Sequence, residues 1–173
     1  GFSYWPGGSD LNDWSSTYAG HFLLEAKNKG YAIPAGMLDK WLAYQTITSR
    51  QWNPISAGTQ PSDGWRYYDS DLTQAYRLYT LALGGKADLA GMNRMREKKD
   101  LFMQAAHLLA AAYAQSGKPE AAKDVLAGKW REDWRYDWWG NTYGSDLRDH
   151  ALELETYTAT GDQNKAQNLA YNI

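Results

Sequence analysis

The sequence contains no cysteine among its 173 residues. Disulfide bonds, thiolate metal sites and a cysteine nucleophile are therefore excluded for this chain. It also has no excess of charge, because 18 Lys and Arg stand against 20 Asp and Glu, for a net charge of −2. Without a basic field there is little attraction for a phosphate backbone, so nucleic acid is not an expected partner.

Long hydrophobic runs are missing as well. No stretch reaches the roughly 18 apolar residues typical of a membrane span, and none has the charged, apolar and small-residue pattern of a secretion signal. Aromatic side chains, in contrast, are abundant, with nine Trp and thirteen Tyr. Rings with polar tips can pack a core, stack on sugars or contact another protein.

Apolar residues recur at helical spacing along most of the chain. The expected helices cover residues 13–29, 34–45, 69–83, 88–97, 101–115, 118–126, 145–160 and 162–171. Tyr18, Phe22 and Ala26 are expected on one apolar face of the first helix, and Pro34 and Pro119 in first turns. The fifth helix is apolar almost all round, which is typical of a helix covered by neighbours on several sides.

Glycines end four of these helices and reveal an internal repeat. The four are Gly30, Gly85, Gly117 and Gly161, and five residues after them stand Ala35, Ala90, Ala122 and Ala166. Glycine allows the chain to reverse in a left-handed conformation, and a small alanine allows the returning helix to come close. The GGK motif at residues 84–86 fits such a helix end better than a phosphate loop, which needs a preceding strand.

The repeat predicts one all-α domain over residues 1–173, in which about four helical hairpins form a partial α/α toroid. Successive stopping glycines are 55, 32 and 44 residues apart. A tetratricopeptide array keeps a period of about 34 residues, whereas a toroid tolerates loops of variable length. A tetratricopeptide-like protein-binding scaffold remains an alternative.

The sequence contains three histidines, which could supply metal ligands or a general base. His21, His107 and His150 fall in separate expected helices without the spacing of a helical zinc site, so they are interpreted as structural. Ser145, Asp149 and His150 are not expected to form a triad, because residues five apart point in different directions and Ser145 suits a helix N-cap. No metal and no cofactor are expected.

Carboxylates near helix starts leave open a second class of function, that of an enzyme. Asp10, Asp13, Asp69 and Asp71 could supply the paired acids of a glycan-cleaving α/α-toroid enzyme, with Asp13 and Asp69 as the pair in that case. Aspartate at a helix start is also favoured by capping and by the helix dipole alone. That second interpretation is preferred, and no enzymatic activity is expected.

The aromatic residues give candidates for an interaction surface. Residues 129–144 hold four Trp and two Tyr between charged residues. This loop could be a sugar-stacking platform, a protein contact or a connection pinned to the body by its own rings. The candidate interface aromatics are Trp5, Trp14, Trp65, Trp134, Trp138 and Trp139.

Several of these motifs, in order, resemble a known family. They are Gly1-Phe2-Ser3-Tyr4-Trp5, Asn12-Asp13-Trp14-Ser15-Ser16-Thr17-Tyr18, Gly30-Tyr31-Ala32-Ile33-Pro34, Thr73-Gln74-Ala75-Tyr76 through Leu83, and Tyr143-Gly144-Ser145 with Arg148-Asp149. Together they are similar to the later part of the thioester-type α/α-toroid domain of bacterial alpha-2-macroglobulins.

The resemblance implies that the chain is a noncatalytic fragment of a protease inhibitor that traps peptidases. Gly1 would then be a cut within a turn, with earlier helices missing. A thioester motif would lie before Gly1, so none is expected in this chain. The implied location is the periplasm or cell envelope, as in family members that are lipoproteins. The implied partners are target proteases and other domains of the parent, and the truncated flank could pair with a second copy.

Overall fold

The computed structural model describes residues 2–3, 7–8, 11–54, 64–130 and 142–173, with the side chains of 64–69 left aside. Regular structure in these ranges consists of helices and one isolated bridge between Ser3 and Leu11. The helices are α1 (Asp13–Asn28), α2 (Met37–Gln51), α3 (Gly64–Leu83), α4 (Leu89–Arg96), α5 (Met103–Gln115), α6 (Pro119–Leu126), α7 (Asp146–Thr160) and α8 (Gln163–Ala170). The all-α prediction is confirmed.

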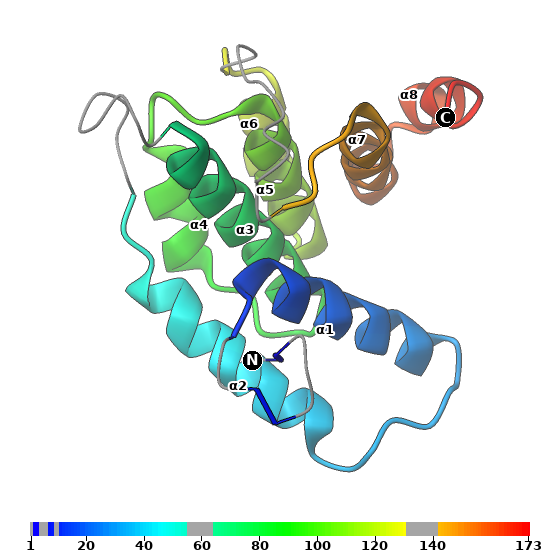
Figure 1. Ribbon diagram of the computed structural model, residues 1–173. Helices are drawn as coiled ribbons and strands as arrows, with labels where there is room; N and C mark the ends of the chain where they lie inside the picture. The colour runs from blue at the N-terminus through cyan, green and yellow to red at the C-terminus, as the bar shows by residue number, and fades with distance from the viewer. Residues whose placement is uncertain (1, 4–6, 9–10, 55–63, 131–141) are drawn as a thin grey trace.

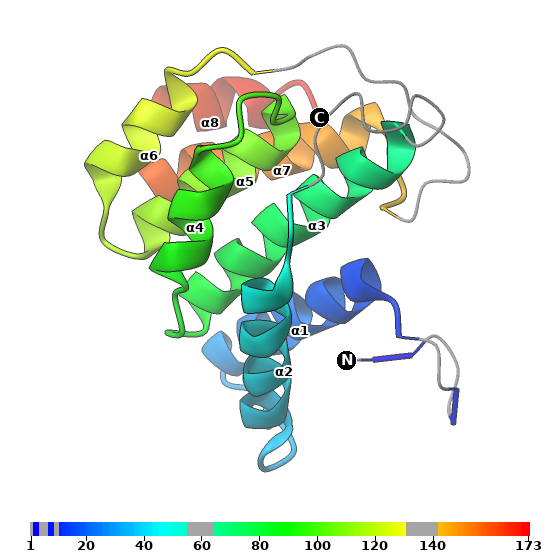
Figure 2. The same cartoon turned by 90° about the vertical axis from the view of Figure 1, so that its left-hand side faces the viewer.

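The helices pair in chain order into four hairpins (Figure 1). α3 packs on both α1 and α5, and α5 packs in turn on α7, so the odd-numbered helices form one continuous layer. Each even-numbered helix packs on its hairpin partner, and α2 and α4 also touch the next odd-numbered helix (Figure 2). The hairpins therefore curl around the odd-numbered layer as the predicted partial α/α toroid.

The four stopping glycines share one local geometry. Gly30, Gly85, Gly117 and Gly161 have φ of 86°, 70°, 71° and 77°. In each case the amide of the residue after the glycine donates a hydrogen bond of 2.8 to 2.9 Å to the carbonyl of the residue four positions before the glycine. This is the hydrogen bond of a Schellman C-cap, which needs a left-handed residue that only glycine adopts at low cost. The predicted reversals are confirmed at all four positions.

The alanines that follow these glycines behave as predicted in only two hairpins. Ala122 and Ala166 are buried, but Ala35 and Ala90 are exposed. In α4 the close approach falls one residue later, where a Cβ added at Gly91 would lie 3.0 Å from Leu78. Packing between neighbouring helices, and not distance along the chain from the glycine, decides which small residue faces a partner.

The first helix buries a different face from the one predicted. Tyr18 and Phe22 are 65% and 67% exposed. The buried residues of α1 are Trp14, Ser16, Thr17, Gly20 and Leu24. Both faces have helical spacing, and α1 stands at the end of the odd-numbered layer, so only the face toward α2 and α3 is covered.

Three helix starts also differ from the predictions. Pro34 lies before α2, whose N-cap is the left-handed Gly36. α3 begins at Gly64 and not at Asp69 or Ser70, and the hydroxyl of Ser70 accepts a hydrogen bond from Trp52 Nε1 (3.0 Å). α5 begins at Met103. Pro119 does stand in the first turn of α6, as predicted.

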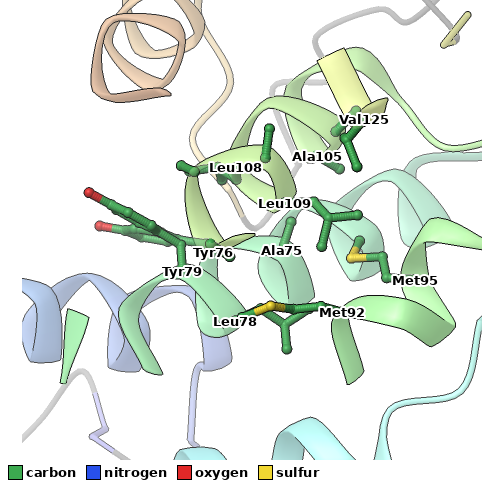
Figure 3. Packing of buried hydrophobic residues seen from close by; sticks show 14 of the residues in the cluster. Ala75, Tyr76, Leu78, Tyr79, Met92, Met95, Ala105, Leu108, Leu109 and Val125 are labelled. Atoms are coloured by element: carbon green, nitrogen blue, oxygen red, sulfur yellow. The ribbon is translucent and has the colours of Figure 1, made fainter. Parts of the chain in front are cut away.

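The main core lies between α3, α4, α5 and α6 (Figure 3). Leu78, Met92, Met95, Leu109 and Val125 meet there, each no more than 1% exposed. Every residue of α5 from Gln104 to Tyr113 is buried, which confirms a helix covered on all sides. Among the helices described, none has the length and apolar character needed to cross a membrane.

Candidate functional site

The first candidate acid, Asp13, is engaged by a buried arginine. Its Oδ2 lies 3.0 Å from Arg77 Nη2, and its Oδ1 accepts a hydrogen bond from Tyr44 (3.0 Å). The Arg77 side chain is only 3% exposed and donates to the amide oxygens of Gln45 (2.8 Å) and Gln74 (2.7 Å). Burial lowers the pKa of Arg77, and the Asp13 carboxylate opposes that shift. Asp13 thus neutralises a cation between the first two hairpins.

This polar network continues across the second hairpin. Gln74 Nε2 donates to Ser49 Oγ (3.1 Å), and that hydroxyl donates to Asp88 Oδ2 (2.8 Å). Arg94 donates to the Ser49 carbonyl (2.9 Å). α1, α2, α3 and the start of α4 are therefore joined by paired polar groups, which is the condition for burying them without a large loss of stability.

The second described acid, Asp71, belongs to a separate site. It is fully buried, with Oδ2 2.9 Å from Lys98 Nζ, and that ammonium lies 2.6 Å from Asp100 Oδ1. Burial raises the pKa of Asp71 to about 7, and Lys98 opposes the rise. Asp10 and the side chain of Asp69 lie outside the described residues. Asp13 and Asp71 each face a cation at a separate site, so their geometry does not support the glycan-cleaving alternative.

The one candidate interface aromatic whose side chain is described, Trp14, is 7% exposed. Its ring centroid lies 5.0 Å from that of Tyr76, and the guanidinium carbon of Arg148 lies 5.8 Å from it. Trp14 therefore packs between α1, α3 and α7. Trp5, Trp134, Trp138 and Trp139, and the side chain of Trp65, lie outside the described residues.

A histidine and two tyrosines meet where α1, α3 and α7 converge. His21 Nδ1 and Tyr76 Oη share a hydrogen bond of 2.9 Å, and the His21 ring lies edge-on to Tyr79, 5.8 Å between centroids. The Tyr79 hydroxyl donates to the carboxylate of Glu155. Figure 3 shows the two tyrosines pointing to the same side, away from Met92 and Met95. Together, His21, Tyr76, Tyr79 and Glu155 form a cluster that we call the inner polar cluster.

Burial dominates the electrostatics of the inner polar cluster. It lowers the pKa of His21, although Glu155 and Glu25 act in the opposite direction. It also raises the pKa of both tyrosines, so their hydroxyls keep their protons at neutral pH. A neutral imidazole and two neutral phenols are suited to holding helices together by hydrogen bonds. They offer no activated nucleophile.

The other two histidines lie on separate helices, His107 on α5 and His150 on α7. His107, on α5, is mostly buried, and its Nδ1 lies 3.8 Å from Glu153 Oε1. Burial lowers its pKa to about 4. His150 is exposed, and Asp149 is held by Gln104 (3.0 Å) and Arg148 (2.8 Å), while Ser145 caps α7. These contacts leave no catalytic triad among them.

A cavity of 310 Å³ opens beside α2, lined by Phe2, Pro34, Ala35, Met37, Lys40 and Trp41. These side chains bring no carboxylate, hydroxyl or imidazole into it. Within the described part of the chain, no three His, Asp or Glu side chains are grouped to hold a metal ion. The described residues thus form structural contacts and no recognisable reaction centre.

Sequence reasoning missed Arg77, Gln74 and Gln45, which hold the first two hairpins together. A signal was present, because polar Gln74 and Arg77 stand three apart on a helix whose other residues from Leu72 to Leu81 are mainly apolar. Polar groups inside such a pattern point to a buried network. The sequence could not name their partners, which come from two other helices.

No family model matches the chain. It is 28% identical over 165 residues to alpha-2-macroglobulins from two strains of Xylella fastidiosa, covering 92% of this chain and 10% of each relative. The chain thus spans about a tenth of the length of these curated relatives.

Solved structures show the same fold at lower identity. The native Escherichia coli alpha-2-macroglobulin spanning domain MG7 to the C-terminus has a TM-score of 0.75 at 22% identity, covering 98% of this chain and 27% of that one. A Salmonella alpha-2-macroglobulin reacted with methylamine has a TM-score of 0.72 at 20% identity, covering 99% and 12%. This chain resembles, over nearly its whole length, one helical segment of the bacterial alpha-2-macroglobulins and adopts the fold of that segment.

Proposed function

We propose that this chain is a noncatalytic α/α-toroid segment of a bacterial inhibitor that traps proteases. The observation that carries the proposal is the sequence similarity to alpha-2-macroglobulins over 92% of the chain, together with the matching fold. Two of the similar Escherichia coli structures are described as activated by trypsin and by porcine elastase. Asp13, Asp71, His21 and His107 lie in contacts between segments of the fold, which agrees with a role without catalysis.

The role of the segment within such an inhibitor is packing and contact with other domains. Trp5, Trp65, Trp134, Trp138 and Trp139 are proposed as aromatic contacts to those domains. Because the chain has no cysteine, it supplies no thioester of its own, and covalent capture would depend on another part of the parent.

The test uses the longer natural polypeptide that contains this segment, mixed with trypsin. Trapping predicts cleavage of the polypeptide and retained activity on a small chromogenic peptide, with lost activity on a large protein substrate. Equal inhibition of both substrates would contradict trapping. The 173-residue chain alone is the control and should inhibit neither.

We further propose a periplasmic or cell-envelope location, which fractionation of the source bacterium with an antibody to this segment would test.

The exposed face of α1, with Tyr18 and Phe22, is proposed to pair two copies of the isolated chain. Sedimentation should then show a dimer that Phe22→Glu converts to monomer. A monomer at high concentration without that substitution would count against the pairing.

A further inference from the structure

The first hairpin has the longest turn of the four. α1 and α2 are joined by residues 29–36, whereas the other three hairpins are joined by residues 84–88, 116–118 and 161–162 (Figure 1). Ala35 lies in this long turn and is exposed, although the repeat predicts it against a partner helix. Together with Pro34 and Met37, it lines the 310 Å³ cavity. The long turn therefore leaves an open space beside the start of α2.

Two aromatic residues of this cavity are held by one buried serine. Ser16 is fully buried, and its hydroxyl accepts a hydrogen bond from the Phe2 amide (2.7 Å) and donates one to the Phe2 carbonyl (3.1 Å). The carbonyl of Ser16 accepts a hydrogen bond from Trp41 Nε1 (2.8 Å). The Trp41 ring also packs on Gly20, where a Cβ would not fit. The Phe2 backbone and the Trp41 ring are thus in place before a ligand enters, which lowers the entropy cost of binding.

One cation stands among the apolar residues that line the cavity. Lys40, in α2, is exposed, and within the described part of the chain its ammonium has no carboxylate partner. The neighbouring acid, Asp39, is also exposed but is not among the lining residues. Aromatic and aliphatic walls with a single ammonium are complementary to a molecule that has an apolar body and one negative charge.

We propose that this cavity binds a small aromatic monocarboxylate, whose ring contacts Phe2 and Trp41 and whose carboxylate pairs with Lys40. The cavity volume of 310 Å³ is at the lower end of the range of about 300–1,000 Å³ that is typical of small-molecule sites, which suits one ring with a short acid chain. A ring is favoured over a plain acyl chain, because aromatic rings attract one another and the thioether of Met37 beyond the effect of their buried area. The site uses the first hairpin and the segment before it, so it does not depend on the proposed role in protease trapping.

The probe for this site is 3-phenylpropionate, and 3-phenylpropionamide has the same shape without the charge. Titration of the 173-residue chain, followed by its amide chemical shifts in NMR spectra, should show saturable binding of the acid with a Kd below about 1 mM. The largest shifts should fall on Phe2 and residues 33–41. The amide should bind about two- to fivefold more weakly, which is the usual contribution of an exposed ion pair. Acetate, which has the charge without the ring, should cause no saturable shift.

Two substitutions test the two parts of the site separately. Ala35→Phe fills the cavity from an exposed position and should weaken binding of 3-phenylpropionate by at least about fivefold, whereas Ala43→Phe, at an exposed position of α2 outside the cavity, is its matched control. Lys40→Gln should remove the difference in affinity between the acid and the amide. Lys29→Gln, at another exposed lysine, should preserve that difference.

Circular dichroism of each variant establishes that the helices are retained before the titration. If Ala35→Phe does not fold, the Lys40→Gln variant and the uncharged probe decide the question. The proposal would be overturned by an absence of saturable binding, by shifts centred on another face, by equal affinity for the acid and the amide, or by equal effects of a test variant and its control.

Discussion

The guanidinium group of Arg148 lies over the ring of Trp14, 5.8 Å from its centroid. Arg148 stands in the first turn of α7 and Trp14 in the first turn of α1, so the first and fourth hairpins meet. Arg148 Nη1 also donates to the carbonyl of Thr142 (2.8 Å), and its Nε donates to Asp149 (2.8 Å). One side chain thus connects the two ends of the curl.

Replacing this arginine should loosen the curl. Arg148→Ala removes the contact with Trp14 and leaves the carboxylate of Asp149, which is 7% exposed, without its cation. We expect a loss of about 2–4 kcal/mol in the free energy of unfolding, measured by urea denaturation followed by circular dichroism. Arg50→Ala, at an exposed position of α2, should change it by less than about 0.5 kcal/mol. Equal effects of the two would contradict the proposed role of Arg148.

Gly20 is required by the approach of α2 to α1. A Cβ at this position would lie 1.9 Å from Trp41 Cε2, and the Trp41 indole donates to the Ser16 carbonyl (2.8 Å), which fixes the ring. Gly20→Ala should therefore destabilise the fold by about 1–3 kcal/mol, although alanine favours helices. In a Trp41→Phe background the same change should cost less, because the clashing ring atoms are gone. A double-mutant cycle in urea with no coupling would contradict this account.

Arg77 should be among the most sensitive polar positions. Arg77→Met leaves the amide oxygens of Gln45 and Gln74 without their donor, and we expect a loss of about 3–5 kcal/mol in thermal or urea unfolding. Lys123→Met breaks a pair with Glu120 whose side chains are 70% and 82% exposed, and it should cost less than about 1 kcal/mol. A small effect at Arg77 would mean that the network contributes little to stability.

Asp71 should make stability fall as the pH rises. Its folded-state pKa of about 7 lies above its ordinary value of 3.8, so the folded chain holds a proton that the unfolded chain releases. This contribution is present below about pH 4 and is lost as the pH rises through about 7, by no more than about 4 kcal/mol. Asp71→Asn should flatten the pH profile of unfolding free energy in that range. Asp124→Asn, at an exposed site on α6, is the control, and a profile that Asp71→Asn does not alter would refute the assignment.

The hairpin turns were predictable because their cause is local. A left-handed residue with a Schellman hydrogen bond needs only a glycine and the helix before it, and all four predicted glycines have this geometry. Ser145 as an N-cap, confirmed by its bond from the Arg148 amide (3.1 Å), is local in the same way. Such features depend on neighbours within one turn of helix.

The faces of the helices were less predictable. In α1 two faces compete, and the predicted one, with Tyr18 and Phe22, is exposed, whereas the face with Trp14 is buried. Ala90 is the small residue that the repeat predicts against the partner helix, but Gly91 is the residue that comes close to Leu78 on that helix. The polar cores around Arg77 and His21 join residues of different helices, and hydrogen-bond partners from separate helices cannot be read from periodicity.

By itself, the sequence determined that four helices stop at Gly30, Gly85, Gly117 and Gly161 and that they reverse in pairs, because glycine conformation, capping and helical periodicity act over a few residues, whereas α2 runs to Gln51, beyond its expected end at residue 45. It also excluded thiol chemistry. Only the tertiary structure decided which side of each helix is covered, and that Arg77, Asp71, His21 and His107 serve as contacts between separate segments. Those outcomes depend on packing between distant segments, since a buried polar group is stable only where another helix supplies its partner.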